Sequence, residues 1–413
     1  MGFRVALQNK RGCMKLEVRQ QIATTTPAHL YVNSKGYEVT RHSFSGSDTF
    51  QFCAKKYELQ RVRGYREKGR KASLEFGKTI EAAVQRYHSG NCDLPGAILK
   101  FTEEWRRLKH EPLTYTSTEE SWEALSLSGQ ELLHLYHLKF PFLSFHANRV
   151  IMPRFQTMYT KEVFPGTSLA GIEFVAYVDM IASLKDEHKK KIVIDIKTSG
   201  TMLDTTPGIH ALDQQLRSYA WITGIPDVAF LVFVKTDRAI GRGSWVSLLQ
   251  GVNIGQTEYN AGNQAIVVKT EGELDEKAWV VKPDTNLDDM RVAAGDRPQT
   301  KEGKARKQAW LEQNAVLVPT HILTKQRIQF LTAHIDAEAQ QETASQIGED
   351  IAMIVRANET NTWKKQGGTR FPNNKCTSCC MRGICLKDDK LRDELVERDD
   401  STEWDFALEE LTA

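Results

Sequence analysis

The strongest constraint on the fold is a change of residue pattern near position 171. From there GIEFVAYVDMIASL is rich in β-branched and aromatic residues, KDEHKKK follows as a polar stretch, and IVIDIKTSG is a second apolar run. Two such runs around a short polar turn are typical of a β-hairpin. We therefore predict adjacent strands at 171–184 and 192–200.

The segments that follow the hairpin continue an alternation of helix and strand. ALDQQLRSYAWITG, from residue 211, has helical spacing and ends at Gly224, a frequent helix stop. VAFLVFVK comes after Pro226 and is a short apolar run typical of a buried strand. A helix and a further strand after the hairpin predict an α/β core.

Helices are also predicted before the hairpin. An apolar stripe at helical spacing runs through 73–88, and Glu81 lies beside it. Residues 43–59 predict an earlier helix, with Cys53 inside it. Residues 100–145 are rich in Trp, Leu and His and predict further helices that belong to an insertion.

The chain is long enough for one large domain with insertions or for two domains. It has 413 residues, and single cores rarely grow beyond roughly 250 to 300. We expect a core at 43–390 with a helical insertion at about 95–150. An N-terminal segment, 1–42, has no pattern that assigns it a role, and 391–413 is expected to form an acidic tail.

A second insertion is expected at about 240–360. Residues 250–310 are polar and predict loops. A long helical stretch from about Thr324 to Asn358 should then lead the chain back to the core.

Composition limits the class of protein only broadly. Apolar residues make up 40% and charged residues 26%, which is ordinary globular composition, and a formal charge of +2 neither requires nor excludes a nucleic-acid partner. The first residues lack the apolar run of a signal peptide, and no stretch approaches the roughly 20 apolar residues that span a bilayer. We expect a cytoplasmic protein without a membrane partner.

Basic residues nevertheless cluster in one stretch. A solvated surface is one interpretation of such a run, and a track for a phosphate backbone is the other. The candidate nucleic-acid-binding residues are Arg61, Arg63, Arg66, Lys68, Arg70 and Lys71.

Two acids and a lysine on the predicted hairpin suit metal-dependent chemistry. Because side chains alternate along a strand, Asp195 and Lys197 project from the same face. Asp179, on the preceding strand, can face Asp195, and carboxylates with the carbonyl of Ile196 are the hard oxygen ligands that Mg²⁺ prefers. The lysine can orient a water or stabilise negative charge. An isolated D-x-K is more often a surface ion pair, but the apolar strand around this one favours an active site.

Four short motifs together resemble a known family. GKTIE, AYVDMI, IVIDIKTS and QLRSY resemble the RecB-like branch of the PD-(D/E)xK nuclease superfamily. This resemblance implies that Asp179 and Asp195 bind a metal and that Lys197 is the catalytic lysine. It also implies that Gln215 and Tyr219, which share a helix face, form the Q-x3-Y motif that contacts DNA. The implied fold is a restriction-endonuclease-like core, a central mixed sheet flanked by helices.

The first motif departs from the family pattern. It usually reads G-x3-H with a metal-binding histidine, whereas here Gly77 is followed by Glu81. A glutamate is a competent Mg²⁺ ligand, yet the change also permits weakened or lost activity. His88, two turns further on, is expected to be structural.

The cysteines near the C-terminus form a second motif. Cys376, Cys379 and Cys385 give C-x2-C-x5-C, with Cys380 as an extra neighbour. Three clustered thiols leave a fourth metal ligand to be found, and Cys53 is the candidate. This arrangement resembles the iron-sulphur staple of AddB-type and CRISPR-adaptation nucleases.

That resemblance implies a structural [4Fe-4S] cluster, for which four thiolates suffice. A structural Zn²⁺ and plain buried thiols are the alternatives. The remaining cysteines, Cys13 and Cys92, are expected to be small core or surface thiols.

The expected function is therefore a Mg²⁺- or Mn²⁺-dependent exonuclease that acts on DNA ends or single strands. A G-x4-G-K-[ST] helicase loop is absent from the sequence, so any unwinding must come from a partner. One alternative is a nuclease that trims ends for a recombination or CRISPR-adaptation protein. A catalytically weak or inactive DNA-binding scaffold is another, and a role in DNA repair or a phage origin would suit the enzyme.

Overall fold

The computed structural model describes most of the chain from residue 28 to residue 398. Cys13 and residues 399–413 of the expected acidic tail lie outside the described part. Within it, the residues not described are 34–35, 91, 116–119, 141–144, 147–153, 185–189, 236–244, 249–251, 255–256, 260–263, 272–276, 282–286, 296–298, 326, 367 and 369–373.

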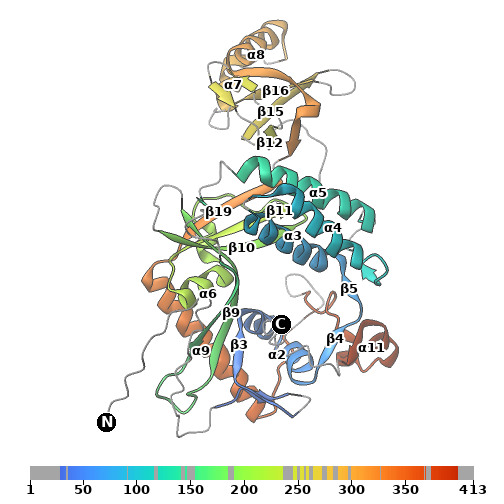
Figure 1. Ribbon diagram of the computed structural model, residues 1–413, viewed down its shortest axis with the longest axis vertical. Helices are drawn as coiled ribbons and strands as arrows, with labels where there is room; N and C mark the ends of the chain where they lie inside the picture. Colours follow the sequence, from blue (N-terminus) through green and yellow to red (C-terminus); the bar gives the residue numbers. More distant parts are fainter. Residues whose placement is uncertain are drawn as a thin grey trace, which may run out of the picture.

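A mixed seven-stranded sheet forms the centre of the molecule (Figure 1). Its main path runs β19-β11-β10-β9-β3, and β7 and β8 also pair with β9. β10 is parallel to β11 and antiparallel to β9, so the predicted mixed sheet is confirmed. The strands are β3 (Arg41–Ser43), β7 (Phe145–His146), β8 (Arg154–Glu162), β9 (Glu173–Leu184), β10 (Lys191–Ser199), β11 (Asp227–Val234) and β19 (Ile328–His334).

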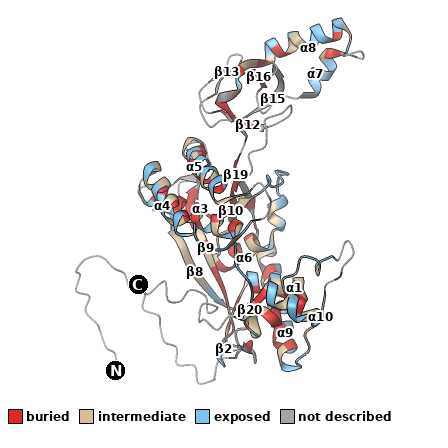
Figure 2. Cartoon of the chain, turned by 90° about the vertical axis from the view of Figure 1, so that its right-hand side faces the viewer, coloured by how far each residue is buried: buried red, intermediate tan, exposed pale blue. Residues whose placement is uncertain are grey.

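Helices cover both faces of this sheet, as the sequence predicted (Figure 1). β11 is buried throughout because its side chains alternate between two hydrophobic cores: Val228 and Phe230 enter one, Ala229 and Leu231 the other. Figure 2 shows buried residues along the strands of the central sheet and on the sides of the helices that pack against it. One core packs beneath α1 (Phe44–Phe52), α6 (Gln214–Thr223) and α9 (Ala337–Glu359), and the other beneath α3 (Ala72–Ser89), α4 (Leu94–Arg107) and α5 (Trp122–Lys139).

The ends of α6 follow from its sequence. Asp213 caps the helix and accepts hydrogen bonds from the amides of Gln215, at 2.9 Å, and Leu216, at 3.0 Å. Gly224 ends it with a φ of 69°, in the left-handed region that glycine adopts without strain. Both predicted ends are thus confirmed, and they fix which side of the helix faces β10.

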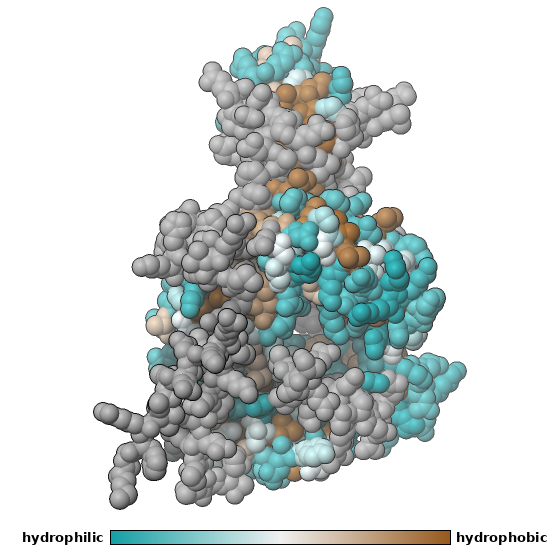
Figure 3. Space-filling view, viewed as in Figure 1, coloured by the Kyte–Doolittle hydropathy of each residue, from teal (hydrophilic) through white to brown (hydrophobic). Residues whose placement is uncertain are grey.

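The outer helices present a hydrophilic surface. On the face drawn in Figure 3, hydrophilic residues predominate where α4 and α5 lie, with some hydrophobic residues among them. α4 contributes Phe101 and Trp105 to the core, and both are fully buried. Among the helices of the described part, none is long and apolar enough to cross a membrane.

A second, five-stranded sheet lies between β11 and β19 in the chain and forms a separate body (Figure 1). Its order is β17-β16-β15-β12-β18, and its two small hydrophobic clusters contain none of the residues of the central cores. The elements are β12 (Trp245–Leu248), β13 (Val252–Ile254), β14 (Thr257–Tyr259), β15 (Gln264–Glu271), β16 (Lys277–Val281), α7 (Leu287–Ala294), α8 (Lys301–Asn314), β17 (Ala315–Pro319), η4 (Thr320–Ile322) and β18 (Leu323–Lys325).

This second sheet corrects the expectation for the later insertion. Residues 250–310 include four strands and most of two helices in place of polar loops. The stretch from 324 is also not helical at first, because β18 and β19 precede α9, which begins at Ala337. The strands were missed because they are short and their polar neighbours hide the two-residue alternation.

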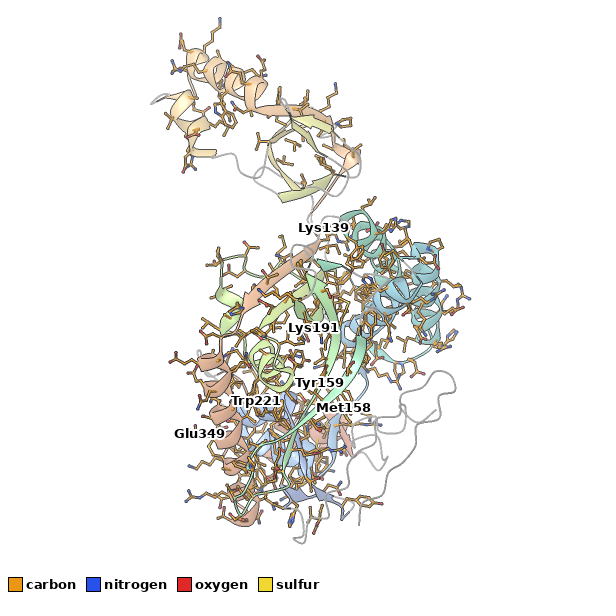
Figure 4. All side chains as sticks on the ribbon, turned by 60° about the vertical axis from the view of Figure 1, so that its left-hand side comes forward. Lys139, Met158, Tyr159, Lys191, Trp221 and Glu349 are labelled. Atoms are coloured by element: carbon orange, nitrogen blue, oxygen red, sulfur yellow. The ribbon has the colours of Figure 1, made fainter. Side chains whose placement is uncertain are left out.

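Arg327 joins the second sheet to the core. Its guanidinium is buried and donates to the carbonyls of Val234, at 3.0 Å, and Lys235, at 2.7 Å, and to Glu131 on α5, at 2.8 Å. The buried ammonium of Lys139, labelled in Figure 4, donates to the carbonyl of Ile328 nearby, at 2.6 Å. The points where the chain leaves and re-enters the core are therefore fastened together.

The cysteine-bearing region packs against the segment that follows α1. β4 (Tyr65–Glu67) pairs with β20 (Val396–Arg398), which carries the folded C-terminal region beyond the boundary expected at 390. The remaining elements are β1 (Tyr31–Val32), β2 (Glu38–Val39), α2 (Ala54–Tyr57), η1 (Glu58–Val62), β5 (Arg70–Lys71), β6 (Leu113–Thr114), η3 (Ile209–Leu212), α10 (Arg382–Leu386) and α11 (Asp389–Leu395).

Candidate active site

The predicted hairpin opens at the two aspartates. The β9–β10 ladder pairs Val193 with Ile181 and Ile194 with Met180, and its register stops there. Asp195 and Asp179 would be the next opposite pair. Instead of a ladder bond, the Oδ2 atom of Asp179 accepts the amide hydrogen of Ile196 at 2.8 Å. The strands therefore separate at the level where the two carboxylates lie.

Lys197 and Asp195 lie on one face of β10, as strand alternation predicts. The Nζ atom of Lys197 is 2.8 Å from Oδ2 of Asp195. Lys197 also donates to the side-chain oxygen of Gln215 at 2.9 Å, and the amide nitrogen of Gln215 donates to Oδ1 of Asp195 at 3.1 Å. The three side chains form a closed triangle of polar contacts.

Tyr219 holds Gln215 in that triangle. The side-chain amide of Gln215 lies 2.9 Å from the Tyr219 hydroxyl, one turn along α6. The hydroxyl in turn donates to the carbonyl of Tyr177 on β9, at 3.1 Å. Lys161 on β8 also contacts α6, since its ammonium lies over the ring of Trp221, labelled in Figure 4, and donates to the Trp221 carbonyl at 3.1 Å.

Glu81 reaches the same place from α3. Gly77 lets the helix approach β10 closely, because a Cβ there would lie 3.1 Å from the Thr198 hydroxyl. One turn later, the Glu81 carboxylate accepts a hydrogen bond from Gln156 on β8, and the same Gln156 nitrogen donates to Oδ1 of Asp179 at 3.2 Å. The structure thus brings Glu81 and Asp179 to opposite sides of one amide group.

Burial dominates the electrostatics of these acids. It raises the pKa of Asp179 to about 7, with the neighbouring charge of Glu81 as the second cause. It likewise raises the pKa of Asp195 to about 7, against the influence of Lys197, and raises the pKa of Glu81. Burial works to lower the pKa of Lys197, but the carboxylate of Asp195 outweighs it and raises that pKa.

The donor set fits a hard divalent cation. Asp195 is 1% exposed, and its buried Oδ2 has the Lys197 ammonium beside it at 2.8 Å. The amide of Ile196 points toward Asp179, and its carbonyl is the further ligand that the sequence predicts. Three carboxylates and a carbonyl are oxygen ligands of the kind that Mg²⁺ and Mn²⁺ select.

The three carboxylates do not close around one common point. In the described part of the chain, no group of three or more His, Cys, Asp and Glu side chains has the arrangement of a finished metal site. Gln156 and Lys197 account for this at the active site, because each places a nitrogen between or beside the carboxylates.

Cys53 lies at a break between two helices, which corrects the prediction that it lies inside one. Its backbone is extended, with φ −169° and ψ 114°, where α1 ends and α2 begins. The following amides bond to the C-terminal region: Ala54 to the side chain of Gln366 at 3.1 Å, and Lys55 to the carbonyl of Lys364 at 3.1 Å. The break turns the thiol toward the segment that carries the other cysteines.

The four candidate ligand cysteines lie near one another, but in the described part of the chain no three of them form a group arranged to hold a metal. The thiol of Cys379 is close enough to Cys53 and Cys376 for their charges to raise its pKa, and Cys385 is affected in the same way by Cys379 and Cys53. For both thiols burial is the larger cause of the raised pKa. Cys380 differs, since after burial its pKa responds first to Glu67.

Lysines surround this group of thiols, defined here as the cysteine cluster (Cys53, Cys376, Cys379 and Cys385). Lys56 lowers the pKa of Cys379, whereas Lys365 and Lys55 lower that of Cys385. Positive charge of this kind favours thiolates, the form that binds metal. By its chemistry an all-sulphur set of four suits an iron-sulphur cluster and also a structural Zn²⁺, although among the described residues the thiols are not arranged as a metal site.

The basic stretch is only partly exposed to solvent. Arg63 pairs with Glu58, and Lys71 pairs with Glu67 at 2.8 Å. Arg61 donates to the hydroxyl of Ser45 at 3.2 Å. The whole stretch comprises Arg61, Arg63, Arg66, Lys68, Arg70 and Lys71, of which Arg63, Lys68, Arg70 and Lys71 are exposed.

His88 does not reach the acids. It is buried at the end of α3, bonds to the hydroxyl of Tyr136 at 2.8 Å and stacks on Phe155, and burial lowers its pKa to about 4. The structural role expected for it agrees with these contacts. Gln156 was not foreseen, because an isolated glutamine in a weakly patterned strand gives no local signal.

The fold and the site together define a class of protein. Its members have a mixed central sheet whose hairpin opens at two acids and a lysine. A sequence model of the PD-(D/E)XK nuclease superfamily matches residues 41–386. The chain therefore belongs to this superfamily.

Other comparisons add little. No curated protein matches the chain. Among solved structures, the crystal structure of SSO0001 is similar at 17% identity over 38% of this chain and 60% of that one, with a TM-score of 0.17. This chain thus spans less than two thirds of that protein, and a superposition of this quality carries no argument.

Proposed function

We propose that this chain is a Mg²⁺- or Mn²⁺-dependent deoxyribonuclease that removes nucleotides from DNA ends or single strands, in the manner of the RecB-like branch of its superfamily. One observation carries the proposal. The central hairpin loses its ladder at Asp179 and Asp195, and Lys197 lies 2.8 Å from the second of them. An interruption of this kind costs stability, and such costs are found most often at functional sites.

Each side chain has a defined part in the proposed reaction. Asp179, Asp195 and Glu81 would hold the cation, with the carbonyl of Ile196 as a further ligand. When bound, a divalent cation polarises the phosphoryl oxygen and lowers the pKa of a water. Lys197 would hold the attacking water and offset the negative charge that develops on the phosphate.

Gln215 and Tyr219 act by positioning Lys197 and Asp195. Gln215 accepts from Lys197 and donates to Asp195, so it keeps the ammonium and the carboxylate at a fixed separation. Tyr219 fixes Gln215 against β9. In this proposal both also border the path of the DNA, and the exposed members of the basic stretch, Arg63, Lys68, Arg70 and Lys71, attract its backbone.

The cysteine cluster would bind a [4Fe-4S] group that fastens the C-terminal region to the junction of α1 and α2. Its four thiols belong to segments more than 300 residues apart, and a crosslink over so long a loop restricts the unfolded chain strongly. Lys55, Lys56 and Lys365 would balance its negative charge. Iron and sulphide analysis of anaerobically purified protein separates this group from Zn²⁺.

A DNA-binding scaffold without activity is the second candidate function. The observation that favours it is the first motif, where Glu81 replaces a histidine and is engaged by Gln156. An end-trimming role alongside a recombination or CRISPR-adaptation partner is compatible with the same active site.

The test uses anaerobically purified protein and end-labelled DNA with Mg²⁺, Mn²⁺ or EDTA. We expect metal-dependent shortening of linear DNA, no cutting of closed circles, and loss of cleavage with retained DNA binding in Asp195→Ala and Lys197→Ala. An Asp48→Asn variant, altered at an exposed helix position, is the matched control. Cleavage that survives both active-site substitutions would rule out this assignment, and a wild-type protein that binds DNA without cutting it would favour the scaffold.

A further inference from the structure

We propose that Gln156 is an additional metal-site residue, whose side-chain amide bridges Glu81 and Asp179 without a cation and turns to offer its carbonyl oxygen as a ligand when one binds. The inference rests on the proposed metal site and adds a residue to it that the superfamily motifs do not include.

The first observation is the position of the amide. The nitrogen of Gln156 donates to the carboxylate of Glu81 and, at 3.2 Å, to Oδ1 of Asp179. A single donor group thus lies between two acids that come from different elements, α3 and β9. A divalent cation is commonly coordinated by two carboxylates around one position. When no cation is bound, an –NH₂ group can donate hydrogen bonds to the same oxygens.

The second observation is the backbone at this residue. Gln156 has a φ of 43°, in the left-handed region, although it lies inside strand β8. The β8–β9 register pairs Phe155 with Met180 and Thr157 with Val178, and it omits the pair between them, Gln156 and Asp179. A non-glycine residue is strained in that region, and strain of this kind persists where the surroundings impose it, often at functional sites. The local turn of the strand aims the side chain at the acids.

The third observation concerns the carboxylate oxygens that the Gln156 amide does not contact. Asp195 lies at the same opening, 1% exposed, and its Oδ2 lies 2.8 Å from the Lys197 ammonium and is not contacted by Gln156. A cation bound there would contact Asp195 and Asp179 together, and the amide of Gln156 already reaches Asp179. A half-turn about the last side-chain bond exchanges the nitrogen for the oxygen without moving the backbone. Glutamine side-chain carbonyls are ordinary oxygen ligands of hard cations.

The experiment measures binding of Mn²⁺ alone, without DNA, by isothermal titration calorimetry. We expect Gln156→Leu, which keeps the size of the side chain and removes its oxygen, to bind Mn²⁺ about tenfold more weakly than the wild type, a loss typical of metal-site partners. Gln156→Glu restores an oxygen at the same place and should recover affinity above that of Gln156→Leu. Thr157→Val, the next residue on β8, is the matched control and should bind as the wild type does.

Gln156→Gly separates the backbone from the side chain. Glycine adopts a φ of 43° without strain, so its melting temperature should equal or exceed that of the wild type while its Mn²⁺ affinity falls as in Gln156→Leu. Unchanged or tighter Mn²⁺ binding by either the leucine or the glycine variant would show that the amide only competes with the cation, and would overturn the proposal. A Gln156→Glu variant that binds Mn²⁺ no more tightly than Gln156→Leu would also overturn the proposal. Failure of the proposed function looks different: the wild type then binds Mn²⁺ but leaves DNA uncut.

Discussion

Replacing Asp195 with asparagine should stabilise the metal-free protein at pH 8 and not at pH 4. Burial raises the pKa of this carboxyl from 3.8 to about 7. Between these two values the folded protein therefore binds more protons than the unfolded chain, and its stability falls as the pH rises. Above pH 7 the full cost of the buried charge is present in the wild type and absent from Asp195→Asn.

The size of the effect follows from the same shift. One pKa unit is worth about 1.4 kcal/mol, so a rise from 3.8 to about 7 corresponds to at most about 4 kcal/mol. That shift already includes the attraction between Asp195 and Lys197, which the variant loses. We therefore expect a gain of up to about 4 kcal/mol in the free energy of unfolding, or several degrees in melting temperature.

Calorimetry or dye-based melting in EDTA, across pH 4 to 8, measures this gain. Asp48→Asn, which removes an exposed charge, should differ from the wild type in melting temperature by the same small amount at every pH in the range. Added Mn²⁺ should reverse the order at pH 8, because the cation stabilises only a protein that binds it. A variant that melts below the wild type at pH 8 in EDTA, or one with the same shift at every pH, would refute the reasoning.

Further predictions concern other parts of the molecule. Cys53→Ser should lower the iron content and the melting temperature of the protein, whereas Cys92→Ser should leave its iron content unchanged; equal iron in both would remove the proposed cluster. Replacing residues 237–325 with a short Gly-Ser linker should leave the central sheet folded, as circular dichroism and melting would show, because the two cores share no residues with the second sheet. Arg327→Ala should cost about 2 to 4 kcal/mol, measured by denaturant unfolding, since it leaves the carbonyls of Val234 and Lys235 without their buried donor. A loss below about 0.5 kcal/mol would mean that the junction is held by other contacts.

The central hairpin was predictable because its signal is local. The residues of β9 and β10 are β-branched and apolar over several periods of strand alternation, and the polar stretch between them admits one connection. The same alternation is enough to assign Asp195 and Lys197 to one face of the strand. The ends of α6 were equally local, since Asp213 and Gly224 are strong helix boundaries.

The second sheet was missed because its strands have no comparable pattern. β13, β14 and β18 are three residues long, and β15 has a register shift between Val267 and Lys269. Short strands derive their stability from neighbours that are distant in sequence, so composition gives little sign of them. Only the start of the long helix expected from Thr324 to Asn358 was wrong, since α9 spans Ala337–Glu359, and β19 before it is apolar enough to belong to either kind of element.

At the active site, strand alternation revealed the acids but not their partner across the sheet. Gln156 contacts Glu81 and Asp179 only through the register of β8 and an unusual φ. Neither property can be inferred from the residues next to it in the sequence. The break at Cys53 was hidden similarly, since an extended residue between two helices is fixed by the C-terminal segment that bonds to it.

The most direct test of the proposed metal site is an anomalous difference map from a crystal soaked in Mn²⁺. We predict a peak in the opening between β9 and β10, about 2.1 Å from a carboxylate oxygen of Asp179 and of Asp195, and no such peak in Asp195→Asn. A manganese peak elsewhere, with the two aspartates still paired to Lys197 and Gln156, would contradict it.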